Sequence, residues 1–272
     1  MKASALLNLK APQNFNRLRS LITIDTWRNR TSESHFNLTT ILKMGFVNLE
    51  RVFIVSANVH VNLEDFAGLK ALTMLRLPNY HEPRRDIETV LKESGDSYVV
   101  GDLASLEGLK RLEILDLSVC AKITGNLSSL ENLTSLKVIL LQQTPVKGDL
   151  KSLARLSKLE EFSFKFDASH EYHCAKEDPN WIGCRGVSGC LSSLSGLRCL
   201  SRVNVLYCPN ITIDIAGFGE TRVKDLTIAG TPNHNIRGAM LCAGSHQWTV
   251  TDFIPEDHSN FIAYDPVLHG VL

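Results

Sequence analysis

Residues 101–117 read GDLASLEGLKRLEILDL, with a leucine at every third position from Leu103 to Leu115 and a final Leu117 two residues later. On an α-helix three residues turn through about 300°, so these leucines would wind around the helix instead of forming one apolar stripe. The spacing therefore excludes a long amphipathic helix. It indicates a coil of chain whose leucines all point into one shared interior.

The opening of this stretch, Gly-x-Leu-x-Ser-Leu, returns three times along the chain. It starts at Gly101, Gly125, Gly148 and Gly189, at steps of 24, 23 and 41 residues, and the last step is one period with about 18 extra residues. A fixed period of this length is the sequence signature of a solenoid. The glycine suits a turn with positive φ, and Asp102, Asn126 or Asp149 after it can cap the helical turn that follows.

The end of each unit alternates with a period of two, as in Leu115-x-Leu117, which predicts a short strand. The stretch from Leu103 to Leu109 predicts a helical or 3₁₀ turn. Alignment of the units places equivalent core residues in successive coils: Leu115, Ile139, Phe162 and Val203.

These units resemble the leucine-rich-repeat family, most clearly in Leu112-x-x-Leu115-x-Leu117-x-x-Cys120 and in the matching stretch that ends at Cys208. The resemblance implies an α/β solenoid, a right-handed curved coil with a parallel sheet on the concave face and short helices or 3₁₀ turns on the convex face. In the family the position of Cys120 and Cys208 is Asn or Cys and hydrogen-bonds backbone inside the turn. Other units carry Thr144, Asp167 and Thr231 there. The subclass stays open between cysteine-containing and plant-type repeats.

The repeat pattern predicts one domain over residues 1–272, built from about seven or eight coils. Recognisable repeats occupy 38–235, and two units are too long, which places insertions at about 81–100 and 168–188. A solenoid needs atypical end units to close its core. We expect residues 1–37 to form an amino-terminal cap with a degenerate first repeat, and 236–272 to form a carboxy-terminal cap.

Composition narrows the classes of function. Lys plus Arg and Asp plus Glu are 29 each, so the net charge is zero, and we expect no nucleic-acid partner. Seven cysteines, an odd number, do not fit a small disulfide scaffold. The sequence shows neither a secretory signal nor an apolar run long enough to span a membrane, so we expect an intracellular, cytoplasmic protein.

The sequence contains no nucleophile-elbow, phosphate-binding or dinucleotide-binding motif, and we expect neither catalysis nor a cofactor. One cluster in the second insertion holds residues that bind metals elsewhere: His170, His173, Cys174 and Cys184. Their spacing is irregular. Three interpretations of this cluster stay open, in this order of preference: loop residues without a ligand, a Cys174–Cys184 disulfide, and a metal site.

Strand alternation predicts which side chains face outward on the concave sheet, among them Asp116 and Ser118 beside the inward-pointing Leu115 and Leu117. The amino-terminal half of this face is rich in apolar residues: Phe53, Val55, Met74, Ile114, Val138 and Leu140. Apolar centres with charged rims suit protein partners. The candidate partner-binding residues are Arg51, Phe53, Met74, Arg76, Ile114, Asp116, Val138 and Leu140.

The leading hypothesis is a non-catalytic interaction module or scaffold that binds a protein through the concave face and the insertion rim. A permanent structural subunit of a larger multiprotein assembly is the alternative, and gel filtration of native extract separates the two. A metal-binding or enzymatic protein built on residues 168–190 is the third hypothesis. The oligomeric state stays open.

Overall fold

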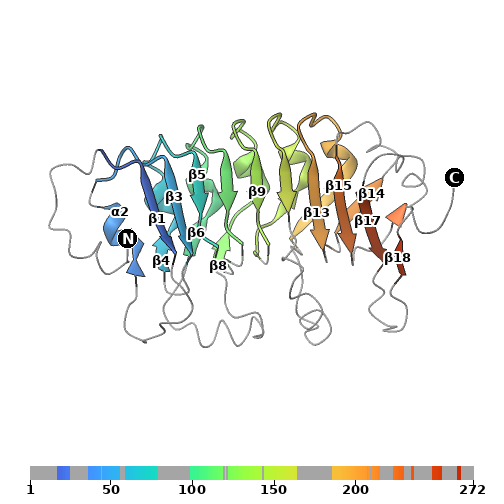
Figure 1. Ribbon diagram of the computed structural model, residues 1–272, viewed down its shortest axis with the longest axis horizontal. Coiled ribbons are helices and arrows are strands. Elements are labelled where there is room, and N and C mark those ends of the chain that lie inside the picture. Colours follow the sequence, from blue (N-terminus) through green and yellow to red (C-terminus); the bar gives the residue numbers. More distant parts are fainter. Residues whose placement is uncertain are drawn as a thin grey trace.

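The computed structural model describes residues 17–24, 36–43, 45–55, 59–78, 99–118, 120, 122–142, 144–163, 186–206, 208, 210–214, 223–229, 234–235, 247–252 and 262–264. Their arrangement is an elongated solenoid with one long sheet along its length (Figure 1). The predicted parallel sheet is confirmed, because its strands pair in parallel from β1 through β17, and only the last strand, β18, pairs antiparallel with its neighbour.

The long sheet contains ten strands in the described part of the chain. In sheet order they are β1 (Ser20–Ile24), β3 (Arg51–Val55), β5 (Met74–Arg76), β7 (Ile114–Asp116), β9 (Val138–Leu140), β11 (Glu161–Ser163), β13 (Arg202–Leu206), β15 (Asp225–Ala229), β17 (Gln247–Asp252) and β18 (Ile262–Tyr264). β1 lies within the segment expected to be the amino-terminal cap, and β17 lies within the expected carboxy-terminal cap. β1 agrees with the degenerate first repeat expected within 1–37, whereas β17 shows that parallel strands extend further toward the carboxy-terminal end than the sequence indicated.

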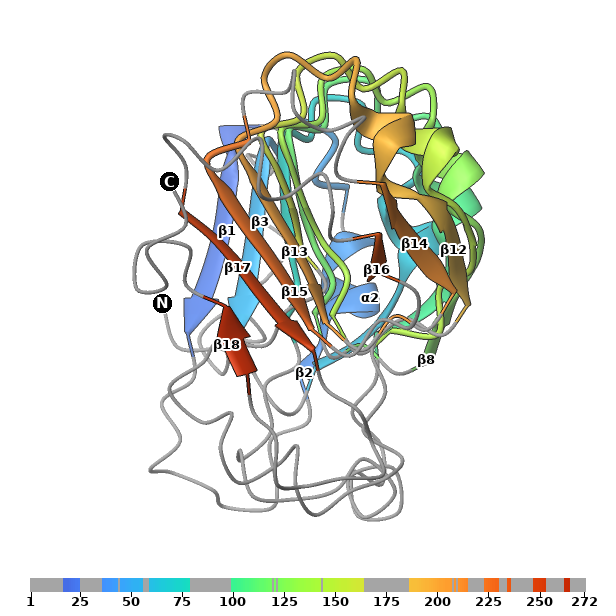
Figure 2. The same ribbon diagram turned by 90° about the vertical axis from the view of Figure 1, so that its right-hand side faces the viewer.

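A second layer of short strands lies across the interior from the long sheet (Figure 2). It comprises β2 (Phe36–Asn37), β4 (Val59–Asn62), β6 (Val99–Asp102) and β8 (Lys122–Thr124), then β10 (Gly148–Asp149), β12 (Val187–Cys190), β14 (Ile211–Asp214) and β16 (His234–Asn235). This layer was not expected from the sequence. Each strand is only two to four residues long, too short for a visible alternation of apolar and polar residues.

Most strands of this layer lead into a single helical turn, as the leucine spacing predicts. The turns are α2 (Leu38–Leu42) and the 3₁₀ helices η2 (Leu63–Phe66), η3 (Leu103–Leu106), η4 (Leu127–Leu130), η5 (Leu150–Leu153) and η7 (Leu191–Leu194). The predicted caps are confirmed at Asp102, Asn126 and Asp149, whose side chains accept a hydrogen bond from the second residue of the turn. Cys190, at the same position before η7, makes no such bond.

The repeated glycines have the positive φ that the sequence indicated, between 111° and 123°. A second constraint comes from stacking of the coils. A Cβ atom at Gly125 would lie 2.7 Å from the capping oxygen of Asp102 in the preceding coil, and at Gly148 it would lie 2.4 Å from that of Asn126. Glycine is therefore required both by its own turn and by the cap beneath it.

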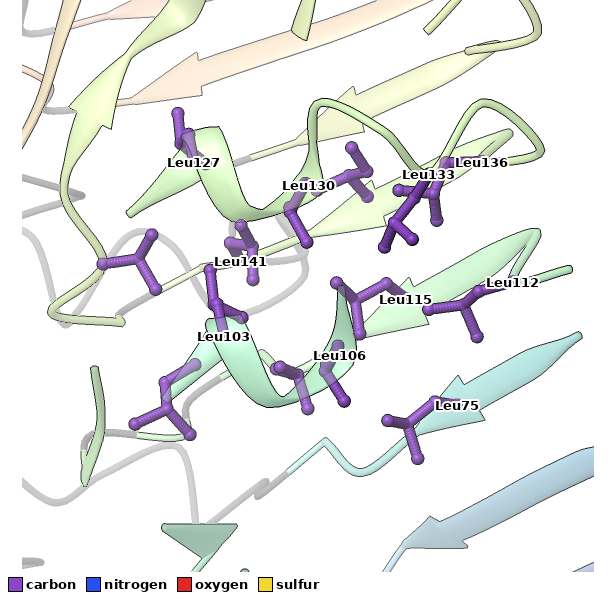
Figure 3. Close-up of a cluster of buried hydrophobic side chains, with 14 of the residues drawn as sticks. Leu75, Leu103, Leu106, Leu112, Leu115, Leu127, Leu130, Leu133, Leu136 and Leu141 are labelled. Carbon is purple, nitrogen blue, oxygen red and sulfur yellow. The ribbon is translucent and has the colours of Figure 1, made fainter. Parts of the chain in front are cut away.

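Leucines from the helical turns and the long sheet fill the interior (Figure 3). The predicted core register is confirmed: Leu115, Ile139, Phe162 and Val203 are paired in sequence across four adjacent strands, and none exposes any surface. These positions form one continuous apolar layer along the solenoid.

The predicted turn hydrogen bonds are confirmed at two positions. Within their own turns, the Cys120 thiol donates to the carbonyl oxygen of Ser118 at 3.8 Å, and the Thr144 hydroxyl donates to that of Leu141 at 2.8 Å. The Cys120 thiol is also 3.2 Å from the carbonyl oxygen of Leu77 in the preceding coil. Both side chains are buried. Asp167 and Thr231 lie outside the described residues.

Both insertions interrupt the chain at the same point of a coil, between a long-sheet strand and the next strand of the second layer. The first lies between β5 and β6, and the second lies between β11 and β12. β6 begins at Val99 and β12 at Val187, slightly before the approximate insertion ends expected at about 100 and 188. Residues 81–98 and 168–185 lie outside the described part of the chain.

Candidate interaction surface

Three apolar residues stand side by side on the outer face of the long sheet. The strand register aligns Met74, Ile114 and Val138 on β5, β7 and β9. Each is partly exposed, whereas the core residues next to them in sequence, Leu75 and Leu115 among them, are fully buried. The alternation expected for strands with one solvated face is confirmed at these positions.

A second outward row runs parallel to the first, two residues further along each strand. It begins with Ile22 on β1, continues through Phe53 and Arg76, and includes Leu140 on β9. Ile22 exposes 49% of its surface and is one of two large hydrophobic residues in the described chain that are clearly exposed. We call the six residues Ile22, Phe53, Met74, Ile114, Val138 and Leu140 the sheet-face patch.

Ile22 was not among the predicted binding residues. The sequence does indicate its outward position. Leu18 and Leu21 have the three-residue leucine spacing of a repeat, so the residue after the inward-pointing Leu21 faces outward. The pairing of Ile22 with Phe53 confirms that position. Val55, the remaining apolar residue predicted here, has a side chain outside the described set.

Arg76 is held rigidly between an aromatic ring and a carboxylate. Its guanidinium carbon lies 4.8 Å from the ring centroid of Phe53. Its Nε and Nη2 atoms donate to Oδ2 of Asp116 at 3.1 and 3.0 Å. The other carboxylate oxygen, Oδ1, accepts hydrogen bonds from the backbone N–H and the hydroxyl of Ser118 at 3.2 and 2.8 Å. Together these contacts restrict the orientation of the Arg76 guanidinium group.

The expected exposure of Asp116 and Ser118 was wrong. Both have zero exposed surface, and Ser163 in the same row as Asp116 is only 3% exposed. Alternation along a strand gives the direction of a side chain but not what covers it, and here Arg76 pairs with the Asp116 carboxylate while Ser118 turns toward it. Asp116 therefore orients Arg76 and is not itself accessible from the surface.

Charges around the patch are mostly paired with one another. Glu113 and Lys137 form an ion pair at 2.8 Å, and the hydrogen bond to Glu113 raises the pKa of the Lys137 ammonium above its usual value. Arg202 and Glu161 form another pair at 2.6 Å. Arg51 differs: it is exposed, its Nε donates to the Ser20 hydroxyl at 3.2 Å, and it makes no ion pair within the described chain.

The possible metal ligands in the second insertion, His170, His173, Cys174 and Cys184, lie outside the described residues. Within the described ranges, His, Cys, Asp and Glu side chains do not gather in any group of three that could hold a metal ion. The helices in these ranges include none that is long and apolar enough to cross a membrane.

No protein-family model matches the chain, and no curated protein sequence matches it. Several solved structures, however, are similar to this chain. Internalin C2 from Listeria monocytogenes is similar with a TM-score of 0.50 and 14% identity, over 88% of this chain and 82% of the internalin. A leucine-rich-repeat protein from Leptospira interrogans is similar with a TM-score of 0.47 and 14% identity, over 80% of this chain and 47% of that one. The chain thus spans about half the length of the Leptospira protein.

The internalin similarity agrees with the repeats, the parallel sheet and the leucine core described above. The chain has the leucine-rich-repeat fold. At 14% identity the likeness concerns architecture, and the function has to come from the surface of this chain.

Proposed function

We propose that this leucine-rich-repeat solenoid is a non-catalytic binding module that holds a protein partner on the sheet-face patch. One observation carries the proposal: Met74, Ile114 and Val138 stand on three adjacent strands and all leave apolar surface exposed. The same row ends in charged residues, Arg51 on one side and Glu161 on the other. An apolar centre between charged residues is the usual composition of a protein interface.

The fixed arginine next to this row supports the same function. Arginine and aromatic residues contribute most of the binding free energy at many interfaces. Arg76 and Phe53 are stacked already, so a partner that contacts them loses little side-chain entropy on binding. The region is therefore organised for binding without any rearrangement of these two side chains.

The experiment needs the natural partner, obtained by affinity capture and identified by mass spectrometry. We expect Phe53→Ala to weaken binding about thirtyfold, because loss of a central aromatic anchor costs about 2 kcal/mol or more. Met74→Ala should weaken binding less but measurably. Isothermal titration calorimetry with the full chain gives the dissociation constants.

Two matched controls define the surface. Asn204 lies in the same outward row as Phe53 but on β13, beyond the patch, and Glu64 is exposed on η2, away from the sheet. Asn204→Ala and Glu64→Ala should bind normally. Normal binding by Phe53→Ala and Met74→Ala, with binding abolished by deletion of 168–188, would place the contact on the second insertion and refute the proposal.

A further inference from the structure

Arg51 and Arg76 lie diagonally opposite each other in a group of four residues on the outer face of β3 and β5, which we call the square. Strand pairing places Arg51 opposite Met74, and Phe53 opposite Arg76. Neighbouring strands are about 4.8 Å apart and residues two apart along a strand about 6.6 Å, so the Arg51 and Arg76 Cα atoms are separated by about 8 Å. Both long side chains can therefore reach one small group placed over the square.

The charges at this square do not cancel. Asp116 lies under Arg76 and neutralises one positive charge through Oδ2. Arg51 has no such counter-ion in the described chain, and its exposed guanidinium keeps Nη1 and Nη2 available beyond the bond from Nε to Ser20. Arg76 uses only Nε and Nη2 for Asp116, which leaves Nη1. As far as the described residues go, the square carries one uncompensated positive charge and several unused donors.

A carboxylate satisfies both the charge and the donors, because guanidinium groups bind carboxylates by charge-assisted hydrogen bonds. A lysine or arginine of a partner would meet like charge there. On one side of the square the surface is apolar and consists of Met74, Ile114 and Val138. Beyond these residues, Glu113 pairs with Lys137 and Glu161 pairs with Arg202, so these charges neutralise one another.

We propose that the partner presents an acidic side chain, Asp or Glu, between Arg51 and Arg76, with large apolar side chains next to it that cover Met74, Ile114 and Val138. This inference rests on the proposed function and specifies the chemistry of its partner. Arg51 determines the preference for acid, Arg76 supplies fixed donors, and Asp116 positions Arg76 without contacting the ligand.

A displayed library of random 12-residue peptides is a suitable probe. It is selected on the immobilised full chain, and enriched peptides are synthesised and titrated by fluorescence polarisation. We expect enriched sequences to contain Asp or Glu beside large apolar residues. Arg51→Gln should weaken their binding about tenfold, and raising the salt concentration from 0.05 to 0.5 M should weaken wild-type binding and affect the variant less.

Arg111→Gln is the matched control, because Arg111 is exposed before β7 and is not one of the patch residues, so its loss should leave binding unchanged. Apolar peptides whose affinity falls with Phe53→Ala but not with Arg51→Gln would overturn the acidic preference and leave the proposed function standing. Peptides that bind Phe53→Ala and Met74→Ala as well as wild type, or a selection without enrichment, would count against both.

Discussion

Leu115→Asp is expected to unfold the protein. Leu115 lies in the middle of β7 with no exposed surface, between Leu75 and Ile139 on the adjacent strands. An aspartate there would bury a charge without a partner, which costs several kcal/mol, and would remove an apolar side chain from the core as well. A total stability of about 5–15 kcal/mol leaves little margin for such a loss. Circular dichroism and urea unfolding measure it.

The control for this change is the preceding residue with the same substitution, Ile114→Asp. Ile114 faces outward and is partly exposed, so the new carboxylate stays in water and the loss of stability should be small. Ser118, although outward by alternation, would be a poor control because it is buried. Equal losses of stability for the two variants would show that the strand register is wrong.

Arg76→Met is expected to reduce the free energy of unfolding by about 3 kcal/mol. Methionine keeps much of the aliphatic length but leaves the fully buried Asp116 carboxylate without its cation, and breaking a buried ion pair costs about 3–5 kcal/mol. Arg76 itself is 34% exposed, which favours the low end of that range. Loss of the contact with Phe53 adds a smaller cost.

Arg202→Met is the matched comparison on the same sheet face. Its ion pair with Glu161 is partly exposed on both sides, so its loss should cost about 1 kcal/mol or less. The double variant Arg76→Met/Asp116→Asn should recover part of the stability, because it removes the buried charge. Equal effects of Arg76→Met and Arg202→Met, or no recovery in the double variant, would contradict a buried ionic role for Asp116.

The core and its register could be predicted because each coil repeats the same constraint. Every leucine at spacing three or two must point inward, so alignment of the units alone places Ile139 beside Leu115 and Phe162. The second layer of strands could not be predicted, because its members are short and carry few inward residues, such as Val61 in β4 and Ile123 in β8. The position of this layer depends on stacking between coils, which sequence spacing does not report.

The outward surface was predicted less well than the core. The apolar row through Met74 and Val138 follows from alternation, and its partial exposure agrees with the structure. The burial of Asp116 depends on a contact with Arg76, 40 residues away, which local alternation cannot reveal. Ile22 was missed because most of the first unit departs from the repeat, although Leu18 and Leu21 indicated its outward position, which its pairing with Phe53 establishes.

Methyl NMR of the full chain shows directly whether the sheet-face patch is the surface that binds the partner. Spectra of methyl-labelled protein are recorded with and without the natural partner or a selected peptide. We expect shifts or broadening at Ile22, Ile114, Val138 and Leu140. Val47, exposed in the loop before β3, and Val100 in β6 should stay unchanged. Perturbation confined to Val47 or Val100, with the patch methyls unmoved, would contradict the proposed binding surface.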